Sequence, residues 1–275
     1  MSKKILYFIG TLSTFVFLTS SARAEIDPEI VYILNTFSFL ICGFLVMWMA
    51  AGFLFLESGL VTTKSVSTIA AKNIGKFAIV SVVFYLFGYN LGYGVPEGGF
   101  IGMPIIWSDA SLVETGYSDA SDWFFQALFV CATCSIVSGA VAERIKIWPF
   151  FLFSAILGGI IYPIQMGWKW GGGWLDVLGF FDFAGSTLVH ACGGSAALAG
   201  VILLGPRLGR FSKTGEPTNM KPFAPSSIPL VALGTFILWM GWFGFNGGSQ
   251  LALGSFEDAT AMSTIFMNTH LAACG

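Results

Sequence analysis

The chain contains a series of apolar runs, each close to the roughly 20 residues that a helix needs to cross the hydrocarbon core of a bilayer. Short polar connections separate these runs, which occupy residues 30–56, 69–93, 123–142, 147–166, 183–204 and 228–245. A seventh run begins near residue 259 and continues to 275. Hydrophobic residues make up 55% of the sequence and charged residues only 10%, which is more apolar surface than one soluble core buries. We therefore expect an all-α integral membrane protein embedded in a lipid bilayer.

Residues 1–24 have the pattern of a cleavable signal peptide. Lys3 and Lys4 precede the apolar stretch ILYFIGTLSTFVFL, and the small residues SARA then lead to a cleavage site after Ala24. The mature membrane domain is then 25–275, and it begins outside the cytoplasm. An uncleaved extra helix is the alternative, although this apolar stretch is shorter than a comfortable span.

Basic and acidic residues fall on alternate connections. With the mature N-terminus outside, the inner connections carry Lys64, Lys72, Arg144, Lys146, Arg207, Arg210, Lys213 and Lys221. The outer connections carry Lys169 and a set of acids: Glu97, Asp109, Glu114, Asp119, Asp122, Asp176, Glu257 and Asp258. Because basic residues are retained on the cytoplasmic side, this asymmetry predicts a multi-pass protein of the cytoplasmic membrane with its mature N-terminus outside.

Several classes of function lack support in the sequence. Cys131 and Cys134, in CATC, have metal or redox spacing, but no histidine or acid neighbours complete a ligand set, so we expect packing thiols and neither metal nor cofactor. No recognised nucleophile motif surrounds the buried Ser, Asp and His residues, so we do not expect an enzyme. The basic residues are scattered over the loops and form no patch, so we expect no nucleic-acid partner.

The apolar run DFAGSTLVHACGGSAALAG, residues 182–200, contains two ionisable residues. Asp182 stands where an aspartate caps the start of a helix. His190 lies about 12 Å deeper and only about 80° round the helix, so both side chains can border one path. An ionisable residue inside a membrane is costly and usually functional. Two interpretations of His190 remain open: a pore-lining group, or a buried histidine hydrogen-bonded between helices.

Aromatic and small polar residues gather at the outer ends of three runs. The segments KWGGGWL (169–175), WFFQALF (123–129) and GWFGFNGGSQ (241–250) supply Trp170, Phe125, Phe129, Trp242, Phe245, Asn246 and Ser249. Aromatic faces attract cations, most strongly where water is excluded. The alternative is an interfacial aromatic belt, which we favour for Trp107 and Trp123.

Four motifs together resemble one known family. WGGGWL, DFAGSTLVH, AERI (142–145) and GWFGFNGGS occur in the order and spacing found in ammonium transporters of the Amt/Mep/Rh family. The resemblance covers essentially everything after the signal peptide, including GFLFLESGLVTTKSV (52–66), which is similar to the first span and loop of the bacterial and plant branch. The resemblance implies a bacterial-type member located in the inner membrane.

The resemblance also assigns roles to individual residues. Trp170, Phe129 and Ser249 match the family's outer ammonium recruitment site, and Asp182 matches the acid that shapes this vestibule. Phe129 and Phe245 match two stacked rings that gate the pore, with Phe125 beside them. His190 matches the first of the paired pore histidines.

Histidine suits the chemistry that this resemblance implies. Ammonium is close to potassium in size and charge, but only ammonium can give up a proton. An apolar pore with an imidazole that hydrogen-bonds the substrate therefore passes ammonia and a proton, whereas a bare metal ion meets the full cost of desolvation. Imidazole can donate, accept and titrate near neutral pH.

The chain departs from the family pattern in its extent. The family fold has eleven spans in two inverted five-helix repeats, with the second pore histidine in the tenth span. This chain holds the first repeat and the start of the second: six complete spans and a partial seventh. We therefore expect a non-conducting fragment of a longer transporter. His270 lies two spans too early to be the second pore histidine.

The resemblance implies two partners and leaves a second function open. Family members are trimeric, with one pore in each subunit, and their cytoplasmic loops meet small signal-transduction regulator proteins. We therefore expect a homotrimer and a regulator that contacts loop 205–227. The alternative function is an ammonium sensor, in which a transporter-like membrane domain is coupled to signalling.

Overall fold

The computed structural model describes residues 26–211, 216 and 223–275, so the expected signal peptide lies outside the described residues. Six helical stretches in this part of the chain are long and apolar enough to cross a membrane. They are Pro28–Leu60 (α2), Thr63–Tyr93 (η1 to α4), Asp119–Ala140 (α5), Ile147–Gly167 (α6 to α7), Ser186–Leu204 (η5 and α9) and Ile228–Gly248 (α10). Helix α11, Phe256–Cys274, follows α10. The all-α membrane architecture is confirmed, and the six spans lie where the apolar runs predict them.

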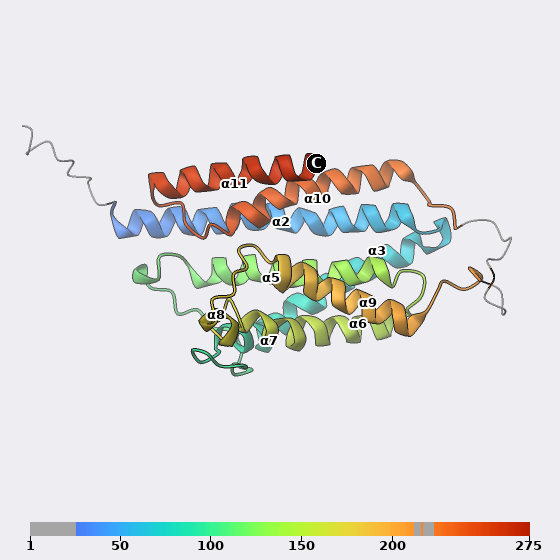
Figure 1. Cartoon of the computed structure of the whole chain (residues 1–275), viewed down its shortest axis with the longest axis horizontal. Helices are drawn as coiled ribbons and strands as arrows, with labels where there is room; N and C mark the ends of the chain where they lie inside the picture. Colours follow the sequence, from blue (N-terminus) through green and yellow to red (C-terminus); the bar gives the residue numbers. More distant parts are fainter. Residues whose placement is uncertain (1–25, 212–215, 217–222) are drawn as a thin grey trace, which may run out of the picture.

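The spans alternate in direction, so the connections gather at two ends of the bundle (Figure 1). One end, which we call the basic end, holds the links from α2 to η1, α5 to α6 and α9 to α10. Its described basic residues are Lys64, Arg144, Lys146, Arg207 and Arg210. The other, acidic end holds the connections 94–118, 168–185 and 249–255, together with the start of α2. The segregation of charge expected from the sequence therefore has a spatial counterpart.

Lys72 is the exception, because it does not lie in a connection. It falls within α3, Val66–Val83, and is only 3% exposed. Its amino group lies 3.2 Å from the Glu57 carboxylate and donates to the carbonyl of Ser138 at 2.7 Å. The assignment of Lys72 to an inner loop was therefore wrong: the lysine is retained in the bundle by a buried counter-charge, which a count of loop charges cannot detect.

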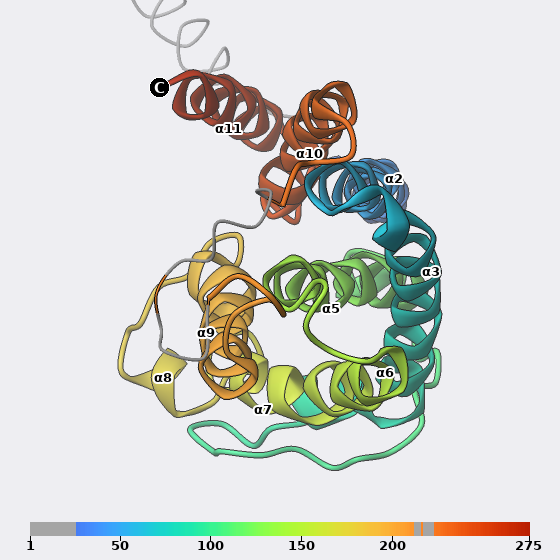
Figure 2. The same cartoon turned by 90° about the vertical axis from the view of Figure 1, so that its right-hand side faces the viewer.

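Helix α5 is the most buried span. In its most apolar stretch 72% of residues are buried, compared with 22% in the η5–α9 span and in α10. It contacts α2, α3 and α9, while α10 packs on α2 and α11 on α10 (Figure 2). The side chains of α5 that face α9 and α2 are therefore buried inside the protein.

Small residues bring α2 and α10 into close contact. A Cβ on Gly244 would lie 2.3 Å from the Cys42 carbonyl oxygen, and one on Gly234 would lie 2.5 Å from the Leu56 nitrogen. Such approaches let backbones pack at short range, as small residues do in membrane helix pairs. This contact fixes α10, and with it Phe245, against α2.

Three of the described spans contain a wide π-helical turn. In the second span, Phe84–Gly88 (η2) joins α3 to Tyr89–Tyr93 (α4). In the fourth, Leu157–Ile161 (η4) joins Ile147–Ile156 (α6) to Tyr162–Gly167 (α7), and in the fifth, Ser186–Ala191 (η5) leads into Cys192–Leu204 (α9). Such turns are rare and often occur at functional sites. The turn of η5 contains His190.

Candidate functional site

The junction that leads into η5 is organised by Asp182. Its Oδ1 accepts hydrogen bonds from the backbone N–H groups of Gly185 and Ser186 at 2.7 and 3.0 Å, and its Oδ2 accepts those of Thr187 and Leu188 at 2.9 and 2.8 Å. One carboxylate therefore satisfies the donors that a helix start leaves unpaired. The predicted capping role is confirmed, although the helical turns begin at Ser186 and not at Asp182 itself.

The same junction holds Trp170 in place. The indole Nε1 donates to the Asp182 carbonyl at 2.9 Å. Gly185 adopts φ +89°, a left-handed conformation that favours glycine, and a Cβ there would lie 2.5 Å from Val189 and 3.3 Å from the indole. The aspartate, the glycine turn and the half-buried tryptophan thus form one unit at the acidic end.

Beneath Trp170 lies a group of buried phenylalanine rings. Phe129 and Phe245 are stacked, with ring centroids 3.7 Å apart and 23° between the planes. Phe125 lies 4.6 Å from Phe129, and the Trp170 ring lies 6.0 Å from Phe129 at 68°. Because Phe129 belongs to α5 and Phe245 to α10, the stack joins helices from distant parts of the sequence.

Ser249 lies at the end of α10, close to this ring group. The hydroxyl donates to the Phe245 carbonyl at 2.8 Å, and the residue is 7% exposed. A Cβ on its neighbour Gly248 would lie 2.6 Å from Cζ of Phe125, so this end of α10 packs against that ring. Trp170, Phe129, Phe245, Phe125 and Ser249 thus occupy one region of the acidic half.

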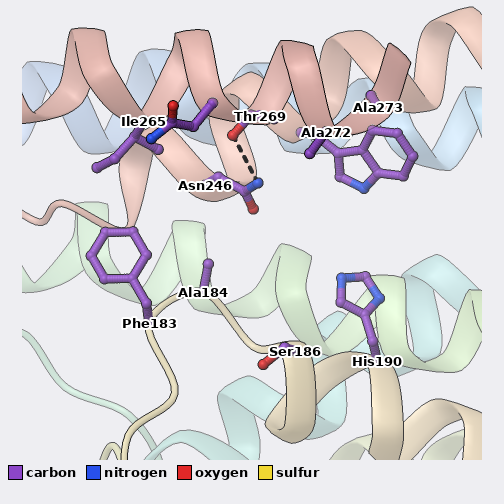
Figure 3. Close-up of a pocket in the computed structure, with 11 residues that line it drawn as sticks. Phe183, Ala184, Ser186, His190, Asn246, Ile265, Thr269, Ala272 and Ala273 are labelled. Carbon is purple, nitrogen blue, oxygen red and sulfur yellow. Dashed lines mark hydrogen bonds between the residues drawn. The ribbon is translucent and has the colours of Figure 1, made fainter. Parts of the chain in front are cut away.

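His190 lies on the other side of the stack from Trp170. Its imidazole centroid is 5.5 Å from that of Phe245. The ring points into a cavity of about 650 Å³ between the η5 segment and helices α10 and α11 (Figure 3). Asn246 and Thr269 face His190 across this cavity and are joined to each other by a 3.0 Å hydrogen bond.

His270 lies outside this cavity. Its ring packs near Trp239 and Phe243, with centroids at 5.5 and 6.2 Å, and the residue is exposed. The two histidines therefore do not form a pair.

A buried charged cluster in the basic half was not anticipated from the sequence. Lys72 pairs with Glu57, and Ser138 donates to the same glutamate oxygen at 2.8 Å. Lys76, 1% exposed, is hydrogen-bonded to Ser135 and to Asn73. The second oxygen of Glu57, Oε1, is buried without a hydrogen-bond partner in the described part of the chain. The signal available was the spacing of Lys72 and Lys76, which places two lysines one turn apart in an apolar helix.

The cysteines behave as packing residues. Cys42, Cys131 and Cys134 are buried free thiols, and Cys131 Sγ lies 3.6 Å from the Ser81 hydroxyl. Among the described residues, no group of three or more His, Cys, Asp or Glu side chains is placed to hold a metal ion.

At the basic end, Glu143 joins two connections. It accepts hydrogen bonds from the backbone and hydroxyl of Thr62, and Arg207 lies 3.0 Å from its Oε2. Partial burial raises the pKa of Glu143, but hydrogen bonds from Thr62 and Ser65 and the charge of Arg207 outweigh this and leave the pKa below its ordinary value.

The described helices form a membrane-crossing bundle with an ionisable histidine inside it, which is typical of membrane proteins that handle polar or ionic substrates. The sequence model of the Ammonium Transporter Family matches residues 37–275, and the chain belongs to this family.

Named relatives agree with this assignment. The chain is 41% identical over 278 residues to a putative ammonium transporter of Synechocystis, covering 97% of this chain and 61% of that protein. It is 42% identical over 246 residues to ammonium transporter Amt2 of Archaeoglobus fulgidus, covering 85% and 50%. The chain thus spans half to three fifths of the length of these relatives.

Solved structures show the same fold. A sensor Amt protein matches with a TM-score of 0.80 at 33% identity, covering 90% of this chain and 61% of that one. Mep2 of Candida albicans matches with a TM-score of 0.69 at 28% identity, covering 83% and 51%. The predicted ammonium-transporter fold is confirmed.

Proposed function

We propose that this protein carries ammonium across the bacterial cytoplasmic membrane by a route that runs from Trp170, past the stacked phenylalanines, to His190. Membership of the ammonium transporter family supports the substrate class. The observation that carries the route is the position of the Phe129–Phe245 stack, which contacts Trp170 on one side and His190 on the other.

Recruitment takes place at the acidic end. Trp170 and Phe129 present ring faces and edges, and Ser249 supplies a hydroxyl oxygen that can accept from ammonium. A cation over an aromatic face gains up to about 2 kcal/mol when water is excluded. Asp182 acts through the backbone, because its carboxylate is occupied by four N–H groups; it holds Trp170 and the start of η5 in position.

The phenylalanine stack acts as the gate. With centroids 3.7 Å apart, Phe129 and Phe245 leave no space between their faces, so the substrate passes only when a ring rotates. Phe125 supports Phe129 from behind. A gate of this kind removes the hydration shell of a cation, which costs a bare metal ion more than a species that can transfer its proton and pass as neutral ammonia.

His190 then receives the substrate below the gate. Its ring nitrogens face the cavity and can accept from or donate to a small nitrogen base. Asn246 and Thr269 line the same cavity with polar groups.

Uptake of labelled methylammonium tests this function. A bacterium that lacks its own ammonium transporters is supplied with the full-length gene product, or with its Phe245→Ala or His190→Ala variant. We expect saturable uptake by the unmodified protein, weaker discrimination against potassium in Phe245→Ala, and at least about tenfold slower uptake in His190→Ala. Uptake no greater than in cells with an empty vector would contradict the proposal.

A sensor function is the second candidate, and one observation favours it: the solved structure with a TM-score of 0.80 is called a sensor Amt protein. A sensor binds ammonium at the same rings without carrying it. Saturable binding of ammonium to the purified protein, measured beside absent methylammonium uptake, would select this function over transport.

We also propose how the protein is oriented in the membrane and how its subunits assemble. The basic end faces the cytoplasm because positive residues are retained there. We propose a regulator contact with loop 205–227, of which residues 212–215 and 217–222 lie outside the described residues. The protein assembles as a homotrimer with one pore in each subunit. Accessibility of an engineered cysteine at Lys64 or Glu114 to an impermeant thiol reagent tests the orientation, and cross-linking in membranes tests the trimer.

A further inference from the structure

Gln165 places a polar side chain in surroundings that are otherwise almost entirely apolar. It belongs to α7 and lines a groove of about 530 Å³ between α5, the α6–α7 span and α9. The other residues of this lining are apolar, apart from Cys192 and Ser195. An amide inside a membrane protein is costly unless it is hydrogen-bonded. The partner of the Gln165 side chain therefore indicates what the residue does.

That partner is the backbone of the turn that contains His190. The Gln165 Nε2 donates to the carbonyl of Leu188 at 2.5 Å. The N–H of Leu188 donates to Oδ2 of Asp182 at 2.8 Å, and the residue is buried. The backbone of Leu188 is thus held by the helix cap at its N–H and by a side chain from another span at its carbonyl, two residues before His190.

The backbone at this point lies between two helical patterns. The carbonyl of Gly185 accepts from the Val189 N–H, four residues on, and from the His190 N–H, five residues on, each at 2.9 Å. The first bond is that of an α-helix and the second that of a π-helix. The turn η5 therefore accommodates one residue more than a regular helix would.

Both ends of this turn are fixed. Asp182 holds the start through four backbone N–H groups. After the turn, Gly193 lies against α5, where a Cβ would be 2.9 Å from the carbonyl oxygen of Thr133. The extra residue therefore stays within the turn, and only its place there can change. One residue corresponds to about 100° of helical rotation, so this place decides whether the His190 ring points into its cavity.

We propose that Gln165 is a positioning residue for His190. By holding the carbonyl of Leu188, it keeps the wide turn in the place that directs the imidazole into the cavity between η5, α10 and α11. Gln165 does not line that cavity, so it acts through the backbone and not on the substrate. The inference deepens the proposed function and rests on it, because His190 is the residue that receives ammonium below the gate.

The ring signals of His190 give a readout that does not depend on transport. The chain has two histidines, so the nitrogen signals of the histidine-labelled chain in detergent micelles are assigned with His270→Ala. Gln165→Met keeps the side-chain length, removes the N–H donor and suits an apolar groove. Ile161→Met places the same side chain in the same groove and span, and is the matched control.

We expect the His190 ring signals to move in Gln165→Met and to stay in place in Ile161→Met. The His270 signals should move in neither variant. Gln165→Leu, which also lacks the donor, should repeat the result of Gln165→Met. Helicity measured by circular dichroism establishes that each variant is folded.

Uptake of labelled methylammonium by the full-length gene product tests the consequence for transport. In Gln165→Met we expect about tenfold slower maximal uptake, with the half-saturating concentration changed by less than about twofold, because recruitment at Trp170 precedes the histidine. Ile161→Met should match the unmodified protein. Uptake in Gln165→Met/His190→Ala should be no slower than in His190→Ala alone, because both changes remove the same interaction.

Three results would overturn the proposal: His190 ring signals that stay in place in Gln165→Met, a double variant that is slower than His190→Ala, or a higher half-saturating concentration with unchanged maximal uptake. The proposed function can fail separately. If the unmodified protein carries no methylammonium and the His190 signals still move in Gln165→Met, transport is wrong and the positioning of His190 stands.

Discussion

Two regions of this bundle place polar or ionisable groups inside the membrane, and they do so in opposite ways. In the acidic half, Asp182 and Trp170 form one hydrogen-bonded junction, and the imidazole of His190 faces a cavity of about 650 Å³. In the basic half, Glu57 and Lys72 face each other between α2 and α3, and each is less than 5% exposed.

The two regions differ in whether the buried polar groups have partners within the protein. The Glu57–Lys72 pair is contacted by Ser138 through both partners and opposes movement, because separating them leaves a buried charge unpaired. His190 has no hydrogen-bond partner for its ring among the described residues, so its nitrogens are left for a ligand. The basic half thus contains a buried ion pair, whereas the acidic half contains an ionisable ring that faces a cavity.

The largest effect is expected from breaking the buried pair. Glu57→Gln leaves Lys72 without its counter-charge and should lower the free energy of unfolding by about 3–5 kcal/mol. Unfolding in mixed detergent micelles measures this change. Glu29→Gln removes an exposed acid from the same helix and should change stability by less than about 0.5 kcal/mol. Equal effects of the two substitutions would contradict a stabilising role for the pair.

The helix junction should be less sensitive than the pair. Asp182→Ala removes the acceptor of four backbone N–H groups, and we expect a loss of about 2 kcal/mol because loop and helix can partly repair the contacts with water. Asp182→Asn keeps one side-chain carbonyl oxygen as an acceptor and should lower the free energy of unfolding by less than Asp182→Ala does. Asp176→Ala, which breaks an exposed pair with Lys169, is the control and should cost no more than about 1 kcal/mol. If Asp182→Ala lowers the free energy of unfolding by no more than Asp176→Ala does, the capping hydrogen bonds contribute little to stability.

The histidine should affect function without affecting stability. His190→Ala removes a ring that projects into a cavity, so the free energy of unfolding should change by less than about 1 kcal/mol, whereas methylammonium uptake should fall at least about tenfold. His270→Ala deletes the same side chain outside the cavity, where the ring lies near Trp239 and Phe243, and should leave uptake unchanged. A large stability loss in His190→Ala, with uptake per folded protein unaltered, would place His190 with the structural residues.

The smallest effect concerns Glu143, and it depends on pH. Because the folded state lowers the pKa of this carboxyl, its contribution to stability is complete above the pKa of an unfolded glutamate and is lost as the pH falls through the lower folded value. The stability difference between the protein and Glu143→Gln should therefore be present at neutral pH, at no more than about 1 kcal/mol, and disappear in acid. If the stability difference between the protein and Glu143→Gln grew on acidification, the pKa of Glu143 would be raised in the folded state and the prediction would be wrong. Glu114→Gln serves as an exposed control.

The fold was predictable because a helix that crosses a membrane needs an apolar run of a definite length. Apolar runs of fixed length located all six spans, and the alternation of charge separated the two ends. Asp182 was predictable for a local reason: a cap lies next to the helix that it caps.

The parts that were missed depend on contacts between distant segments. Lys72 was counted with the inner connections although the run 69–93 contains it, because its partner Glu57 lies on another helix and no local pattern pairs the two residues. The cavity facing His190 includes Thr269, which is 79 positions away in the sequence and meets the histidine only after α11 has packed on α10. The π-helical turn that contains His190 also had no signal in the apolar pattern.

The stacked rings have a consequence for the order in which the protein is made. Phe129 is synthesised more than a hundred residues before Phe245, and the two can meet only after α10 has packed its glycines against α2. The ring stack is therefore completed in the same step that brings α10 onto α2. A nascent chain that has inserted only its first five spans therefore holds Phe129 without its stacking partner, because Phe245 arrives only with the sixth span.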